Sequence, residues 1–401
     1  MKQRVARTVS IALAVALSAG TAALAPAAQA AEPKHGHEAT RTALRALVEQ
    51  GGLPGVAAKV RDEKGSWFGQ SGYADTGTGR KRSAGEHFRG ASITKPFVAT
   101  VLLQLDAEGR LDLDDTVERW LPGLLRGNGY DGGKVTLRQL LNHTSGIANY
   151  NDDPDFSHAT TGLGFPEHRY DTYTPEELVA IALKTPAQPD PESRPSYSNT
   201  NFVLAGMVVE KATGHSYAQE ITRRIIRPLK LRGTSFPGTS PHMPKPHPVG
   251  YSRLDQDATP DAEIHDATEQ NMTWLGAAGD VISTSGDLNR FQRALVKGEL
   301  LPPQQTKEMF EEVPAGHGLG YGLGVEFAQL SCGVKVVGKS GSTNGSLSAM
   351  VGTQDGEHQL TFNVNGDWLQ DSSLYVNVVE AEFCGRIPAR TDQAPAVPRL
   401  G

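Results

Sequence analysis

The sequence has no excess of basic residues, no short repeat and few cysteines. Lysine and arginine number 39 against 45 aspartate and glutamate residues, so the formal net charge is −6. This balance argues against a nucleic-acid-binding protein, because such proteins neutralise phosphates with clustered basic side chains. The 401 residues are 38% hydrophobic and 21% charged, which is typical of a globular protein with a large core. We expect no nucleic-acid partner.

Long hydrophobic runs are also missing. The short apolar stretch 11–17 follows a basic start and precedes Ala28-Gln29-Ala30, which is the pattern of an export signal with a small-residue cleavage site. This stretch is too short to span a membrane, and no later stretch is long enough either. We therefore expect residues 1–30 to be a signal peptide and the remaining chain to be secreted, without a membrane span.

The chain has two cysteines, Cys332 and Cys384. An even cysteine count in an exported protein predicts a disulfide, and two buried free thiols are the alternative. Beyond the second cysteine, residues 386–401 contain proline and no core-forming pattern, so we expect a disordered tail.

Hydrophobic periodicity predicts an α/β plus all-α fold. Helices are expected at 37–50, 92–108 and 371–383, and strands at 56–60, 67–73, 332–338, 347–353 and 358–364. The simplest architecture is an antiparallel sheet from both ends of the chain (31–110 and 275–385), flanked by the terminal helices, with a helical domain (111–274) inserted.

Capping-box patterns mark helix starts inside the predicted helical domain. They are Thr136 with Gln139, Thr174 with Glu177, and Ser216 with Gln219. Two long polar segments, 149–169 and 236–260, are predicted loops that wall a cleft.

Ser92 and Lys95 form a Ser-x-x-Lys pattern at the start of an apolar helix. A spacing of three puts both side chains on one face, where a lysine with a lowered pKa can take the proton of the serine hydroxyl. The alternative is a helix-capping serine followed by a surface lysine.

A second pattern, Tyr197-Ser198-Asn199, stands directly before another helical run. A tyrosine can relay a proton, and an asparagine amide can hold both a lysine and a substrate carbonyl. The alternative is that Ser198 or Asn199 only caps the helix.

A third pattern runs from Lys339 through Ser340, Gly341 and Ser342 to Thr343, after the predicted strand 334–337. The lysine supplies positive charge, and the glycine allows a substrate to lie against the strand. The backbone N–H of Ser342 can face an oxyanion together with that of Ser92. The alternative is a polar turn at the end of a strand.

Together these patterns resemble the serine penicillin-recognising enzymes: penicillin-binding proteins, class C β-lactamases and, above all, secreted D-alanyl-D-alanine carboxypeptidases. The three motifs stand in the family's order, and the resemblance covers residues 37–384. It includes Leu-Leu-Asn-His-Thr-Ser-Gly at 140–146, Trp274 with 277–279, the glycine-rich run 320–324 and both cysteines. The implied fold is that of β-lactamases and transpeptidases.

The resemblance implies a role for each motif residue. Ser92 would be acylated, with Lys95 and Tyr197 sharing the proton transfers and Asn199 orienting Lys95 and the substrate amide. A further set would bind substrate: Lys339, Ser340, Gly341, Ser342, Thr343 and Trp274. The similar carboxypeptidases carry an arginine for the substrate carboxylate six residues before the first cysteine, where this chain has Glu326.

Two other functions have weaker support. Residues 333–340 match the P-loop pattern, but the valines at 334, 336 and 337 favour a strand over a phosphate-binding loop. The histidines form no His-Glu-x-x-His motif, so we expect no metal or other cofactor. We interpret His143 as a structural, hydrogen-bonding histidine.

We expect a secreted, monomeric serine hydrolase that forms an acyl-enzyme on small peptides or β-lactams. A D-alanyl-D-alanine carboxypeptidase acting on peptidoglycan stem peptides is the leading hypothesis. The alternatives are a β-lactamase, a D-aminopeptidase or an esterase of the same fold, or a penicillin-binding sensor with negligible turnover.

Overall fold

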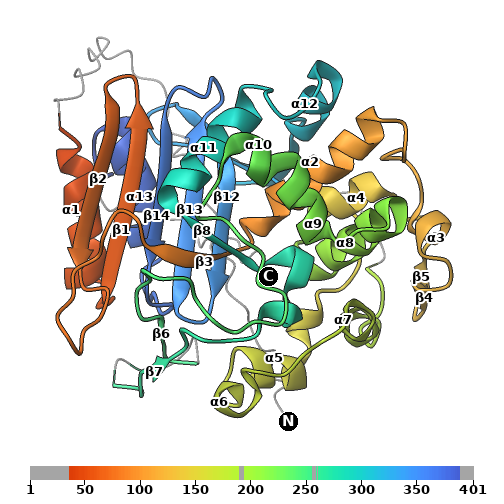
Figure 1. Ribbon diagram of the computed structural model, residues 1–401, viewed down its shortest axis with the longest axis horizontal. Helices are drawn as coiled ribbons and strands as arrows, with labels where there is room; N and C mark the ends of the chain where they lie inside the picture. The colour runs from red at the N-terminus through yellow and green to blue at the C-terminus, as the bar shows by residue number, and fades with distance from the viewer. Residues whose placement is uncertain (1–35, 189–193, 255–258, 260, 389–401) are drawn as a thin grey trace, which may run out of the picture.

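A computed structural model describes residues 36–188, 194–254, 259 and 261–388. The predicted signal peptide and most of the predicted tail lie outside these residues. The centre of the fold is an antiparallel sheet built from both ends of the chain (Figure 1). Its strands, in order across the sheet, are β2 (Gly65–Gly72), β1 (Gly55–Asp62), β14 (Gln359–Val364), β13 (Ser346–Thr353), β12 (Lys335–Thr343), β11 (Glu326–Gln329), β10 (Leu319–Tyr321) and β9 (Val313–Gly316).

The two faces of the sheet pack against different helices. Side chains alternate between faces along a strand, so neighbouring residues such as Val336 and Val337 enter separate hydrophobic clusters. The terminal helices α1 (Glu38–Glu49) and α13 (Ser373–Cys384) cover one face together. Helix α11 (Ser285–Val296) covers the other, between the sheet and the helical region. The predicted fold class is confirmed.

The middle of the chain is helical, as predicted. Its helices are α3 (Val117–Trp120), α4 (Leu137–Leu141), α5 (Pro154–Thr160), α6 (Phe165–His168), α7 (Pro175–Ala182), α8 (Asn199–Thr213), α9 (Tyr217–Ile221) and α10 (Arg227–Leu229). The three predicted capping boxes start α4, α7 and α9. The segment 149–169 was predicted as a loop, which is wrong, because it forms a 3-10 helix at Tyr150–Asp152 and then α5 and α6. The exact division at residues 110 and 274 stays a prediction.

Short strands account for most of the elements that periodicity did not predict. Strands β9 to β11 extend the sheet, and β3 (His87–Ala91) pairs with β8 (Val281–Thr284). Two-residue pairs join β4 (Arg126–Gly127) to β5 (Tyr130–Asp131), and β6 (Tyr251–Ser252) to β7 (His265–Asp266). Strand β12 does not end at Gly338 as predicted but continues to Thr343, so the Lys-Ser-Gly motif lies within the strand.

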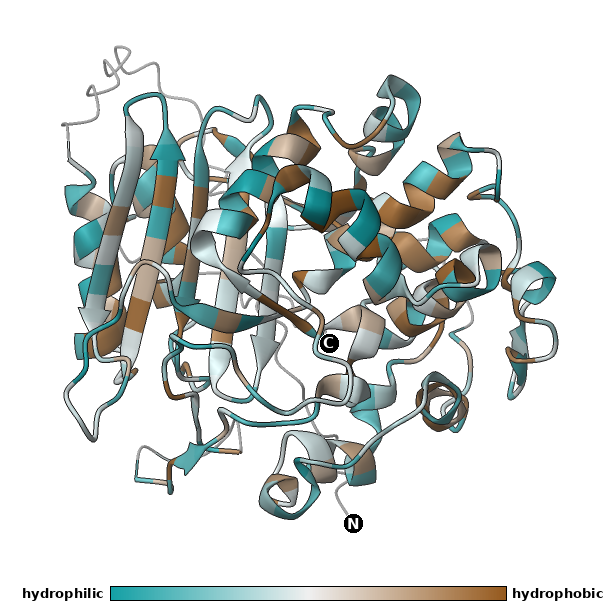
Figure 2. Cartoon of the chain, viewed as in Figure 1, coloured by the Kyte–Doolittle hydropathy of each residue, from teal (hydrophilic) through white to brown (hydrophobic). Residues whose placement is uncertain are grey.

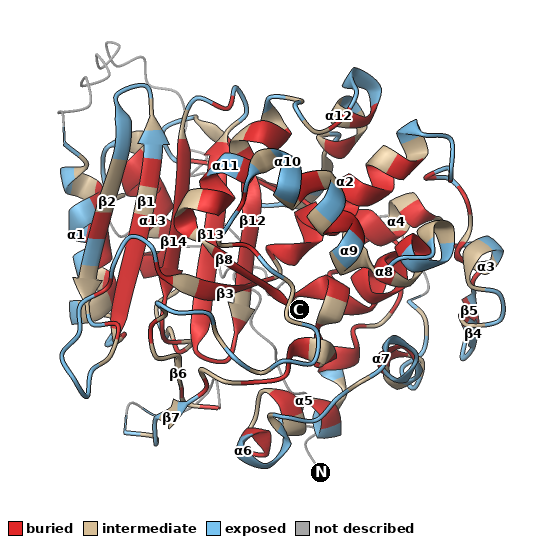
Figure 3. Ribbon diagram, viewed as in Figure 1, coloured by how far each residue is buried: buried red, intermediate tan, exposed pale blue. Residues whose placement is uncertain are grey.

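Helix α2 (Thr94–Ala107) runs through the centre of the protein, as its apolar sequence predicted. Hydrophobic residues gather in the strands and inner helices, and hydrophilic residues cover the outer turns and α12 (Pro303–Met309) (Figure 2). Most residues of α2 are buried (Figure 3). The helix therefore holds its first turn, and the residues just before it, in a fixed position.

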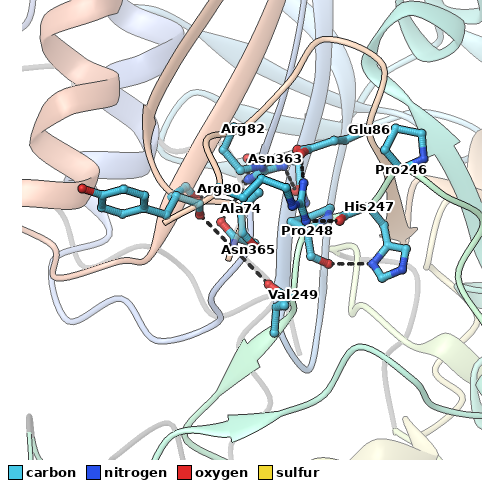
Figure 4. Close-up of polar contacts among 12 residues, drawn as sticks. Ala74, Arg80, Arg82, Glu86, Pro246, His247, Pro248, Val249, Asn363 and Asn365 are labelled. Carbon is cyan, nitrogen blue, oxygen red and sulfur yellow. Dashed lines mark hydrogen bonds and ion pairs between the residues drawn. The ribbon is translucent and has the colours of Figure 1, made fainter. Parts of the chain in front are cut away.

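A buried polar network fastens the segment before β3 to the sheet (Figure 4). Arg82 Nε donates to Glu86 Oε2 at 2.7 Å, and Arg82 Nη2 donates to Asn363 Oδ1 at 2.9 Å. Arg80 donates to Glu86 Oε1 at 2.9 Å and to the His247 carbonyl at 2.6 Å. Because Glu86 directly precedes β3, this network fixes the start of the strand that leads into the candidate site.

Cys332 and Cys384 form a disulfide, with Cα atoms 5.7 Å apart, so the predicted pairing is present. It ties the turn before β12 to the end of α13. Within the described residues, no helix combines the length and apolar character needed to cross a membrane.

Candidate active site

Ser92 lies in the turn that connects β3 to α2. The preceding residue, Ala91, has φ of 47°, a left-handed conformation that alanine rarely adopts. Ser92 itself is partly exposed. The capping alternative does not hold, because Ile93 precedes the first helical residue and makes no side-chain cap. The fold thus keeps a strained turn where the hydroxyl projects, as is common at functional sites.

Lys95 is fully buried in the first turn of α2. Its Nζ donates to Asn199 Oδ1 at 2.7 Å and to the Ala278 carbonyl at 2.7 Å, and it lies 2.9 Å from Ser92 Oγ. Burial lowers the pKa of Lys95 well below its ordinary value, and the nearby charge of Lys339 lowers it further. A surface lysine is therefore excluded, and the neutral amine can accept the proton of Ser92.

Tyr197 places its hydroxyl 2.6 Å from Ser92 Oγ. The ring is buried, and Lys95 Nζ lies 4.8 Å from the ring centroid. Burial raises the pKa of the Tyr197 phenol far above its ordinary value. The side chain therefore stays a neutral phenol that can pass a proton between Ser92 and a leaving group.

Asn199, the first residue of α8, is held by two other asparagines. Its Oδ1 faces Lys95, so its Nδ2 points the other way and donates to Asn151 Oδ1 at 3.2 Å. The Asn199 backbone N–H donates to Asn149 Oδ1 at 3.0 Å. Sequence reasoning did not single out Asn149 or Asn151, although both stand at the start of the polar segment predicted to wall the cleft.

The Lys-Ser-Gly motif presents a free strand edge to Ser92. Strand β11 pairs with β12 only as far as Gly338, so β11 does not cover the edge beyond. A Cβ at Gly341 would lie 2.0 Å from the Gly90 carbonyl oxygen and 3.1 Å from Ser92 N, so only glycine permits this approach. Because N–H groups alternate along a strand, Ser342 N points to the same edge as Ser340 N. The backbone N–H groups of Ser92 and Ser342 can then face one oxyanion.

Glu326 occupies this edge next to the lysine. Its carboxylate forms a buried ion pair with Lys339 and accepts the Ser340 N–H at 3.1 Å and the Ser340 hydroxyl at 3.0 Å. Glu326 is 7% exposed and Lys339 is 2% exposed. Burial lowers the pKa of Lys339, and the Glu326 carboxylate opposes that effect. The cation and the hydroxyl predicted to bind a substrate carboxylate are thus already bound to an internal one.

Two other predicted substrate-binding residues are also buried. Thr343, at the end of β12, is 5% exposed. Trp274 is 4% exposed and lies edge-on to Phe156, with ring centroids 6.5 Å apart. Substrate contact by these two side chains stays a prediction. The described residues contain no cluster of three or more metal-ligating side chains.

Comparison with known proteins agrees with this geometry. A D-stereospecific amidohydrolase from Streptomyces sp. is 50% identical, with a TM-score of 0.81 over 87% of this chain and 99% of that one. A D-amino acid amidase from Ochrobactrum anthropi SV3, complexed with D-phenylalanine, is 27% identical, with a TM-score of 0.74 over 87% and 99%.

Sequence relatives point the same way. A penicillin-binding protein of Bacillus subtilis (strain 168) is 28% identical over 73% of this chain, although the match spans only 64% of that relative's length. The family model described as Beta-lactamase matches residues 40–370. The chain is a serine hydrolase that belongs to the Beta-lactamase family.

Proposed function

We propose that this enzyme is acylated at Ser92 by amides and esters of D-amino acid residues whose leaving group carries no free carboxylate. Ser92 Oγ attacks the substrate carbonyl while its proton passes to Lys95, directly or through Tyr197. The oxyanion forms between the N–H groups of Ser92 and Ser342. The leaving amine or alcohol takes the proton back, and water then cleaves the ester at Ser92 by the same proton transfers.

The observation that carries this proposal is the contact of Glu326 with Lys339 and Ser340. A substrate carboxylate at that position would bring a second negative charge beside the first. Displacing Glu326 instead would break a buried ion pair, which costs about 3–5 kcal/mol. An amide or ester meets neither penalty. The D-stereospecific amidohydrolase and the D-amino acid amidase support the choice of D-configured substrates.

A D-alanyl-D-alanine carboxypeptidase stays the competing prediction, together with a β-lactamase or a penicillin-binding sensor. It needs a cation for the terminal carboxylate, and Glu326 stands where the similar carboxypeptidases have arginine. We further propose that the chain is exported and monomeric. The signal-like N-terminus and the disulfide support export.

The test compares two substrates that differ only in the carboxylate: N-acetyl-D-Ala-D-Ala and its C-terminal amide. We expect kcat/KM to favour the amide about tenfold or more, and to vanish in Ser92→Ala. Glu326→Arg should raise kcat/KM for the free acid about tenfold with little change for the amide, since a charge-assisted hydrogen bond contributes about 1.5–3 kcal/mol.

Glu312→Gln is the matched control. Glu312 forms an ion pair with Lys335, which lies on β12 like Lys339 but away from Ser92. It should leave both substrates unchanged. A wild-type preference for the free acid would overturn the proposal in favour of the carboxypeptidase.

A further inference from the structure

His143 lies directly behind the segment that carries Tyr197. It follows α4 with φ of 62°, a strained conformation for a histidine, and it is fully buried. Its carbonyl accepts the Ser196 N–H at 2.8 Å, and its Nδ1 accepts the Ser198 N–H at 3.2 Å. Its ring packs against the Tyr197 ring, with centroids 4.5 Å apart. His143 therefore fixes the position of Tyr197 in two ways: it accepts hydrogen bonds from the residues on either side, Ser196 and Ser198, and its ring packs against the Tyr197 ring.

The hydrogen bonds of His143 fix its tautomer. The Ser198 backbone N–H can only donate, so Nδ1 carries no proton. Asn201 Nδ2 lies 3.2 Å from the same nitrogen, and its orientation is set because Asn201 Oδ1 accepts from the Ser145 hydroxyl at 2.7 Å. The ring proton is then on Nε2, which donates to the Tyr321 hydroxyl at 3.1 Å.

The surroundings of His143 keep it neutral. Burial lowers its pKa well below the ordinary value, and the charge of Lys339, together with that of Lys95 whenever Lys95 is protonated, lowers it further. Protonation of Nδ1 would also break the bond from Ser198. His143 is thus unsuited to act as the general base, although it lies beside the reacting groups.

We propose that His143 is a positioning residue that holds the Tyr197 hydroxyl at Ser92. The proposal rests on the proposed function, since it assumes that Tyr197 moves protons for Ser92. The imidazole is suited to this role because it accepts the Ser198 N–H, donates to the Tyr321 hydroxyl and packs on the Tyr197 ring.

A double-mutant cycle tests this role. His143→Asn keeps an acceptor near the Nδ1 position but loses the ring, and Tyr197→Phe removes the hydroxyl that the ring positions. With Tyr197 present, His143→Asn should lower the acylation rate constant for a D-amino acid p-nitrophenyl ester about tenfold or more, with little change in KM. In the Tyr197→Phe background it should have less than about a twofold effect, because the two losses are not additive.

Two further measurements separate positioning from simple support of the fold. The acidic limb of the kcat/KM profile should stay unchanged in His143→Asn, since His143 does not titrate in the reaction. His358→Asn, which alters another hydrogen-bonded histidine far from Ser92, should leave the rate unchanged. His143→Gln is measured in parallel so that a folding failure of one variant does not remove the test.

Equal losses in the Tyr197 and Tyr197→Phe backgrounds would overturn the positioning role. A displaced acidic limb would overturn it as well, by making His143 a titrating catalytic group. Absence of Ser92-dependent acylation in the wild type would instead overturn the proposed function itself.

Discussion

Lys95 Nζ lies 2.9 Å from Ser92 Oγ, and all three hydrogen-bond partners of this amine are neutral oxygen atoms. No carboxylate among them stabilises the ammonium form. Burial and the Lys339 charge both favour the neutral amine. Lys95 is therefore suited to the proposed role of base for Ser92.

This relationship predicts a specific pH dependence. Activity requires neutral Lys95, so kcat/KM for a neutral ester should fall as the pH drops through the lowered pKa of Lys95. Lys339→Met removes a like charge and leaves the Glu326 carboxylate unpaired. Both changes raise the pKa of Lys95, so the acidic limb should move to higher pH. Lys335→Met, on the same strand, should leave the limb in place. An unmoved limb in Lys339→Met would contradict the assignment of the base.

Gly341→Ala should disable acylation. The new methyl group would overlap the Gly90 carbonyl oxygen at 2.0 Å and crowd Ser92 N at 3.1 Å, and the overlap is relieved only by shifting β3 or β12. Separation of the two oxyanion donors should lower the acylation rate constant about a hundredfold. Gly85→Ala, where the added methyl group has open space, should have no effect. Stopped-flow measurement of acylation checks both variants. A fully active Gly341→Ala would show that the close approach of β12 to Gly90 and Ser92 is not needed for acylation.

Removal of the disulfide should reduce stability but not activity. The Cys332–Cys384 bond closes 52 residues, which corresponds to about 4 kcal/mol in the chain-entropy account. The double variant Cys332→Ala/Cys384→Ala should therefore unfold at lower urea concentration, while kcat stays near the wild-type value. Reductant should lower the stability of the wild type and leave that of the variant unchanged. Equal urea midpoints would contradict the estimate.

Asp280 should make the fold less stable as the pH rises. Burial raises its pKa from 3.8 to about 7, although the Tyr217 hydroxyl donates to it at 2.6 Å. The folded state then binds more protons than the unfolded state between these two values, so the stability falls across this window. Above pH 7 the penalty reaches about 4 kcal/mol. Asp280→Asn should remove this slope, as urea unfolding at several pH values would show.

Local sequence patterns predicted the helices best. The capping boxes at Thr136, Thr174 and Ser216 each act within four residues, so the sequence alone contains the whole interaction. Strands β9 to β11 were missed because they are only three or four residues long, and they are stabilised by pairing with one another and, at β11, with β12. The short helices after Asn149 were missed for a similar reason, since packing rather than periodicity defines them.

The contacts of the candidate site likewise include some that local sequence predicts and some that it does not. Ser92 and Lys95 are one helical turn apart, so their proximity follows from the sequence. The contact between Glu326 and Lys339 depends on the register of β11 against β12, which no local pattern contains. Resemblance identified Glu326 as unusual, but only the structure shows that its carboxylate binds Lys339 and Ser340, the residues predicted to bind a substrate carboxylate.

Strand β1 lies next to β14, and Val56 is paired with Val364. The sheet is not complete until almost the whole chain is available, because the β1–β14 pair joins residues from opposite ends of the sequence. Such long-range pairing is slow to form. A nascent chain therefore cannot form the β1–β14 pair during most of its synthesis. Activity then appears only after the C-terminal strands have arrived, so no hydrolase is assembled before the last part of the chain is in place.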